Sequence, residues 1–162
     1  MNAATFVHDY FAAEKIGSLV FMLIGAAAIA WAVLLLRRRS SLRGMAAPLI
    51  AVALIQLVVG STVYLRSDAQ RASLQQQLRA DPAAFKAAET PRMKAVIANF
   101  ALYRSLELGL LALGMALVVL LRNREFWFAF GLGLVLQAAL MLALDFFAQR
   151  RAHEYFKAVL GA

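Results

Sequence analysis

Four long apolar segments constrain the fold more than any other feature of this chain. They cover residues 16–36, 45–65, 96–121 and 126–147. Each is about as long as an α-helix must be to cross the roughly 30 Å hydrocarbon core of a bilayer. Lipid offers no hydrogen bonds, so the backbone of such a segment must satisfy itself as a helix or within a closed barrel. We therefore predict an all-α integral membrane protein, an antiparallel four-helix bundle that forms one domain over residues 1–162.

The composition supports this class. Hydrophobic residues make up 63% of the chain, charged residues only 16%, and the mean hydropathy is +0.71, far from the values of an ordinary soluble domain. The absence of cysteine excludes disulfides, thiolate catalysis and iron–sulfur clusters. The formal charge is +8, but the basic residues follow loops and helix ends, as in most membrane proteins. We expect the lipid bilayer as partner, and no nucleic acid.

The chain outside the apolar segments is expected to be helical as well. Residues 66–94 are polar and Gln-rich, and they contain two Pro residues that each follow a capping side chain, at Asp81-Pro82 and at Thr90-Pro91. This pairing is typical of a helix start, so we predict two short helices there. The helical pattern of the last apolar segment continues through residues 148–160. We therefore predict that the helices extend beyond the membrane on the side that carries both termini.

Basic residues give an orientation for the bundle. Only Lys15 precedes the first apolar segment, whereas Arg37, Arg38, Arg39 and Arg43 follow it. The first helix usually dominates the positive-inside rule, so the short turns are expected in the cytoplasm and both termini outside, which is the periplasm for a bacterial inner membrane. The total number of basic residues favours the opposite orientation.

Polar side chains recur at helical spacing inside or beside the apolar segments. Residues four apart share one helix face, and Asn99, Tyr103 and Glu107 do so with Arg104 next to them. Glu107 lies about 21 Å along the helix from Leu121, which would place it about 9 Å below the membrane surface. Together with similar faces on the other helices, these positions predict a polar pocket that opens toward the termini. Its candidate ligand-binding residues are Glu14, Tyr64, Asn99, Tyr103, Arg104, Glu107, Asp145 and Gln149.

Two other interpretations of these polar residues remain open. Ionisable groups at membrane depth usually face the bundle interior and pair with one another, so Arg104 is expected to pair with Glu107, Asp145 or Glu14. The network would then only fix the helix register. Alternatively, the polar side chains would face another membrane subunit, in a homo-oligomer or a larger complex.

Few residues suggest cofactor or catalytic chemistry. His8 and His153 are the only histidines, and they are the candidate ligands for one metal ion or one haem, since neutral imidazole binds both. No spacing motif supports this site, and the sequence requires no cofactor. No nucleophile–base motif, phosphate loop or dinucleotide fingerprint occurs. The sequence therefore assigns no enzyme activity.

The function predicted from the sequence is that of a small membrane-embedded ligand-binding, sensing or accessory subunit, which acts through the outward-facing polar pocket. The alternative is a small proton-coupled transporter in which Glu107 carries the proton. A haem- or quinone-binding membrane protein is the third interpretation.

Overall fold

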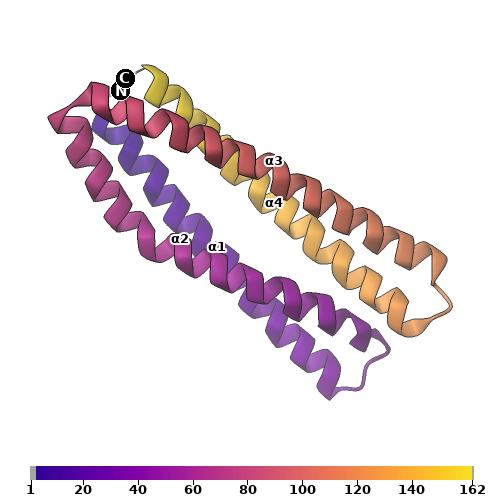
Figure 1. Cartoon of the computed structure of the whole chain (residues 1–162). Helices are drawn as coiled ribbons and strands as arrows, with labels where there is room; N and C mark the ends of the chain where they lie inside the picture. The colour runs from indigo at the N-terminus through magenta and orange to yellow at the C-terminus, as the bar shows by residue number, and fades with distance from the viewer. Residues whose placement is uncertain (1–2, 162) are drawn as a thin grey trace.

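The computed structural model describes residues 3–161, and all its regular elements are helices (Figure 1). They are the long helices α1 (Ala3–Arg37), α2 (Ala46–Ala80), α3 (Pro82–Leu120) and α4 (Glu125–Gly161), with a short 3-10 helix, η1 (Ser41–Met45), before α2. No strand occurs in this range. The all-α prediction is confirmed, and each of the four long helices is long and apolar enough to cross a membrane.

The helices form two antiparallel hairpins, α1–α2 and α3–α4, with both termini at one end of the molecule (Figure 1). Helix α4 joins the hairpins, because it contacts α1, η1 and α2 as well as α3. By contrast, no Cα atom of α3 lies within 8 Å of one in α1 in the described chain. Helix α3 is therefore the peripheral helix, held mainly by α4.

One of the two predicted helix starts is confirmed and the other is wrong. The Asp81 side chain accepts hydrogen bonds from the backbone N–H groups of Ala83 and Ala84, both at 3.0 Å, and so caps α3. Thr90-Pro91 does not begin a helix, because α3 runs through it. The side chains of Glu89 and Met93, on either side of the proline, are both buried. Their packing stabilises a continuous helix and offsets the hydrogen bond that Pro91 cannot donate.

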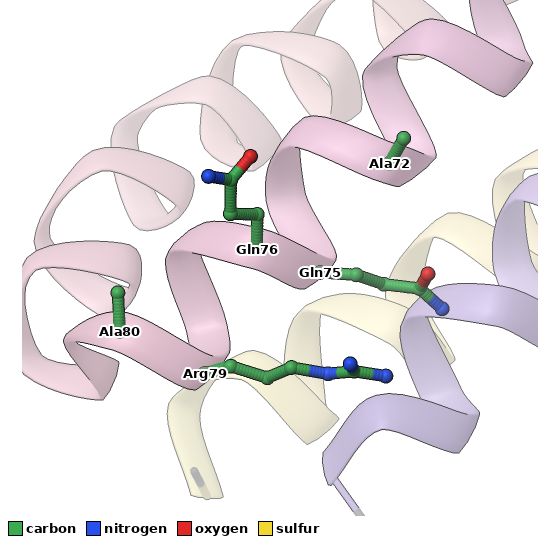
Figure 2. A pocket seen from close by; sticks show the side chains of 5 residues that line it. All are labelled: Ala72, Gln75, Gln76, Arg79 and Ala80. Carbon is green, nitrogen blue, oxygen red and sulfur yellow. The ribbon is translucent and has the colours of Figure 1, made fainter.

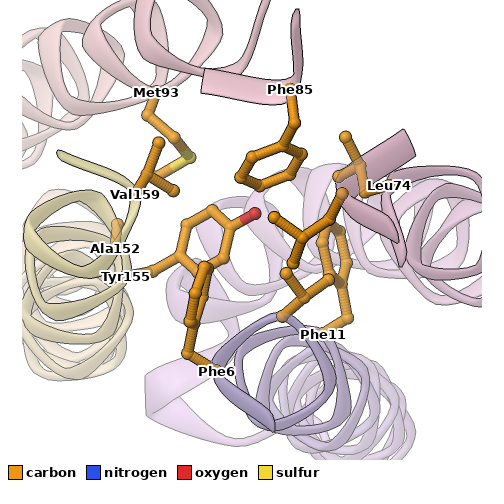
Figure 3. Close-up of a cluster of buried hydrophobic side chains, with 10 residues drawn as sticks. Phe6, Phe11, Leu74, Phe85, Met93, Ala152, Tyr155 and Val159 are labelled. Carbon is orange, nitrogen blue, oxygen red and sulfur yellow. The ribbon is translucent and has the colours of Figure 1, made fainter. Parts of the chain in front are cut away.

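Two clusters of buried apolar side chains hold the ends of the molecule together. The first, which we call the cap cluster, lies at the end with the termini and has members from all four long helices (Figure 3). It consists of Phe6, Val7, Phe11, Leu74, Leu78, Phe85, Met93, Ala152, Tyr155 and Val159. The second cluster lies at the end with the short turns and consists of Ala28, Ala32, Leu35, Met45, Ala46, Leu49, Ala53 and Ala129. Helix α3 contributes nothing to this second cluster.

Glycines let the helices approach closely between these clusters. A Cβ atom added at Gly114 of α3 would lie 2.9 Å from the carbonyl oxygen of Gly131 in α4. One added at Gly44 of η1 would lie only 2.3 Å from the carbonyl oxygen of Phe126. Small residues at such crossings allow backbone contact where lipid gives no hydrophobic drive for association.

Candidate functional site

The centre of the candidate site is a pair of acidic side chains, Glu107 on α3 and Asp145 on α4. Glu107 is only 2% exposed, and within residues 3–161 neither of its carboxylate oxygens has a hydrogen-bond partner that meets normal geometry. The two carboxyl groups nevertheless lie close enough for one protonated carboxyl to donate to the other, and within residues 3–161 no salt bridge involves either of them. Like charges without a counter-ion are costly in a low-dielectric environment. Both carboxyl groups are therefore expected to need a proton or a counter-ion.

Contacts between the helices give the level of Glu107 along the bundle. Gly114 crosses α4 at Gly131, and the Gln137 side chain of α4 donates a 3.3 Å hydrogen bond to the carbonyl oxygen of Leu49 in α2. Glu107 precedes Gly114 by about two helical turns, so its backbone lies near the level of Ala138 in α4 and of Ile50 in α2. With a rise of 1.5 Å per residue, this level is about 6 Å from the start of α2.

Two buried glutamines, Gln56 and Gln137, also carry polar atoms without partners in the described chain. Both amide atoms of Gln56 and the Oε1 atom of Gln137 lack a hydrogen-bond partner among the described residues. Buried polar groups are rarely left unpaired in proteins, so such positions call for an explanation. Gln137 is a residue that the sequence analysis missed. An amide side chain inside an otherwise apolar segment was the signal that could have identified it.

The other predicted residues of α3 do not join the acidic pair. Asn99, Tyr103 and Arg104 are all exposed, and within residues 3–161 no salt bridge involves Arg104. The cause is the peripheral position of α3. Only the narrow face that carries Glu107 meets α4, whereas the neighbouring faces of the helix point outward.

The predicted residues of the first hairpin form a separate polar group. Glu14 accepts a 3.1 Å hydrogen bond from the Ser67 hydroxyl and lies 4.0 Å from the Arg66 guanidinium. The Lys15 ammonium lies over the Tyr64 ring, 4.7 Å from its centroid, and forms a salt bridge with Asp68 of α2. Gln149 of α4 is half-buried. The structure therefore divides the predicted pocket residues among the acidic pair, the α1–α2 hairpin and the outer face of α3.

One hollow of the described chain lies away from all of these residues. It has a volume of about 460 Å³ and is lined by Ala72, Gln75, Gln76, Arg79 and Ala80. Figure 2 shows that all five side chains come from one helix, α2, near its end. A hollow lined by a single helix is an open surface rather than an enclosed binding site.

The cap cluster contains a buried polar group that the sequence analysis missed. Glu89 is 1% exposed, and its carboxylate accepts hydrogen bonds from Arg92 Nε at 2.7 Å and from the Tyr155 hydroxyl at 2.8 Å. The Tyr10 ring stacks on the Tyr155 ring at 4.2 Å. Burial raises the pKa of the Tyr155 phenol above its usual range, and the charge of Glu89 adds to this effect. The i, i+3 spacing of Glu89 and Arg92 was the available sequence signal.

The two histidines lie apart from these groups, each near one end of the chain. His8 is exposed and its Nδ1 atom lies 3.2 Å from the carboxylate of Asp9. His153 is also exposed and contacts the Gln149 carbonyl oxygen at 2.9 Å. In the part of the chain that the structure describes, no three His, Asp or Glu side chains are grouped as a metal site. The geometry therefore gives no support to a ligand role for either histidine.

Comparisons with protein-family models, with curated proteins and with solved structures find no match to this chain. Arguments about its function therefore rest on the geometry alone.

Proposed function

We propose that the chain spans a bacterial inner membrane as a four-helix bundle, with the cap cluster and both termini in the periplasm. The middle of the molecule supports this arrangement, because large apolar side chains face outward there, such as Val58 of α2, which is 66% exposed. Trp127 and Phe126 lie exposed at the start of α4, where aromatic rings are common at a membrane surface. Four arginines after the first span, against Lys15 before it, favour the turns in the cytoplasm.

Within the membrane, we propose that the protein binds a small cation at Glu107 and Asp145. The observation that carries this proposal is the buried Glu107 carboxyl group beside the half-buried Asp145 carboxyl group, with no salt bridge to either in the described chain. Buried charges are normally paired or neutralised. A protonated amine would do both, because its positive charge offsets the carboxylates and its N–H groups donate to their oxygens. The chemical class of the ligand is therefore a proton or a small organic ammonium ion.

Proton-coupled transport is the second candidate. The burial of Glu107 within an apolar segment favours it, since a proton bound there is shielded from water on both sides of the membrane. A transporter needs such a group to exchange its proton with each side in turn. A protein that only binds its ligand needs access from one side.

A binding experiment tests the cation site. Phenethylammonium is added to the full-length protein in mild detergent, with phenethyl alcohol as the uncharged analogue, and the thermal unfolding midpoint is measured. We expect the amine, but not the alcohol, to raise the midpoint. Glu107→Gln and Asp145→Asn should each abolish this rise, because an amide can no longer supply the negative charge.

Glu154→Gln is the matched control. Glu154 is an exposed carboxylate of the same helix as Asp145 and pairs only with Arg150, so this variant should respond like the unmodified protein. An equal response of the unmodified protein and Glu107→Gln would refute the cation site. A proton flux in proteoliposomes that disappears with Glu107→Gln would select transport.

A further inference from the structure

The end of the molecule opposite the termini concentrates positive charge. The two hairpin turns are far apart in the sequence, but they lie together because Gly44 of η1 packs against the backbone of Phe126 at the start of α4. This contact gathers the exposed arginines Arg37, Arg38, Arg39, Arg43, Arg122 and Arg124. Glu125 is the acidic residue of these turns. An excess of arginine at one membrane face attracts anionic lipid.

A hollow of about 240 Å³ opens beside these arginines, and its lining changes in character with depth. It is lined by Trp31, Leu34, Leu35, Arg38 and Ser40. The first three residues belong to the apolar part of α1, whereas Arg38 and Ser40 lie beyond the end of that helix. One continuous segment lines this hollow, so it is an open surface with an apolar part on α1 and a cationic part just beyond. An open surface of this kind suits a lipid, which the bilayer holds against the protein, rather than an enclosed soluble ligand.

The turn next to this hollow keeps an arginine where glycine would be favoured. Arg39 has φ of 47°, and within residues 3–161 it is the one residue other than glycine with a positive φ. Its N–H group donates to the Leu36 carbonyl, and the Ser40 N–H group donates to the Leu35 carbonyl, which closes the end of α1. Glycine usually occupies this left-handed position after a helix because a Cβ atom is disfavoured there. Strained positions of this kind tend to mark functional sites.

We infer that this end of the protein holds an anionic phospholipid, with its phosphate at Arg38 and an acyl chain along Trp31 and Leu34. Arginine suits the phosphate because its planar guanidinium donates two parallel hydrogen bonds. The apolar floor selects a lipid over a soluble phosphate, which would contact the rim and gain nothing from Trp31. Arg39 adds charge beside the headgroup at the expense of local backbone stability. This inference rests on the proposed membrane insertion but not on the cation site.

Fluorescence quenching tests the lipid site. The protein has two tryptophans, so Trp127→Phe leaves Trp31 as the sole fluorophore. This single-tryptophan protein is reconstituted into phosphatidylcholine vesicles that contain an equal minor fraction of either brominated phosphatidylglycerol or brominated phosphatidylcholine. We expect the anionic lipid to be enriched at Trp31 roughly fivefold, because one arginine near a membrane surface favours anionic lipid by about that factor. Equal quenching by the two lipids would overturn the inference.

Variants in the same background separate the hollow from general charge attraction. Arg38→Gln should bring the ratio of the two quenching efficiencies close to one. Arg122→Gln removes the same charge from the same end but lies outside the hollow, so it should leave most of the preference. Equal losses in these two variants would show that only the net charge matters and would overturn the site. Arg39→Gly should reduce the preference while raising the unfolding temperature, and this pair of opposite effects is not expected of a merely structural arginine.

Discussion

Replacement of Arg92 by methionine should destabilise the protein strongly, although Arg92 lies on the surface of the cap. The substitution keeps an unbranched apolar stem and removes the guanidinium that donates to the Glu89 carboxylate. Glu89 would then remain buried with the Tyr155 hydroxyl as its one remaining donor in the described structure. A buried charge that loses its partner costs more than a hydrogen bond between neutral groups.

The structure sets the size of this effect. Breaking a buried ion pair by removal of one partner typically costs about 3–5 kcal/mol. The Arg92 side chain is 28% exposed, so water can reach part of the vacated space, and we expect a loss of about 3 kcal/mol in the free energy of unfolding. Glu89→Gln should cost only about 1–2 kcal/mol, because it removes the buried charge itself.

The double variant gives the sharpest outcome. If the uncompensated charge of Glu89 causes the loss, Arg92→Met combined with Glu89→Gln should be more stable than Arg92→Met alone by about 1–2 kcal/mol. The exposed pair of Arg150 and Glu154 provides the control. Arg150→Met should change the free energy of unfolding by about 0.5 kcal/mol or less.

Equilibrium unfolding in mixed micelles with increasing denaturing detergent, followed by circular dichroism, measures these differences. The reasoning would be refuted if Arg92→Met were as stable as Arg150→Met. It would also be refuted if the double variant were the least stable of the set, since the charge of Glu89 would then not be the source of the loss.

Two further predictions concern the helix crossing and the buried tyrosine. Gly109→Ala should raise the free energy of unfolding by about 0.5–1 kcal/mol, because its Cβ would meet nothing within 4 Å. Gly114→Ala on the same helix should lower the free energy of unfolding by about 1–2 kcal/mol, because its Cβ would overpack against Gly131. Equal stabilities of the two variants in the same unfolding assay would contradict the close crossing. Because the folded state raises the pKa of Tyr155, it keeps a proton that the unfolded chain releases above about pH 10, so stability should fall as the pH rises past that value. Absorbance at 295 nm, which reports ionised tyrosine, checks this prediction. In the folded protein, Tyr155→Phe should leave the rise in absorbance near pH 10 unchanged, because Tyr155 does not ionise there. In denaturant, the same substitution should reduce the rise.

The four helices follow from the sequence because the length and hydropathy of a segment decide whether it can cross a bilayer. The polar residues were harder to place. Periodicity gives the face of a helix on which Glu107 lies, and this was enough to single it out together with Asp145. It does not give the neighbour of that face, which depends on how the two hairpins pack.

The peripheral position of α3 shows this limit most clearly. Arg104 precedes Glu107 by less than one helical turn, and its pairing with an acid was a reasonable expectation from the sequence. The structure leaves it exposed, since α3 meets only α4 at this depth. Glu89 and Tyr155 are far apart in the sequence, and no local pattern indicates that the Tyr155 hydroxyl reaches the Glu89 carboxylate.

The dependence of α3 on α4 also bears on how the chain is made. During synthesis the α1–α2 hairpin is complete before α3 emerges, but it offers α3 almost no surface. In the proposed membrane arrangement, a carboxyl group inside the bilayer costs up to roughly 3 kcal/mol on insertion scales, and Glu107 would bear this cost until α4 is made and buries it. We therefore expect α3 to wait at the insertion machinery and to enter the lipid together with α4, as one unit.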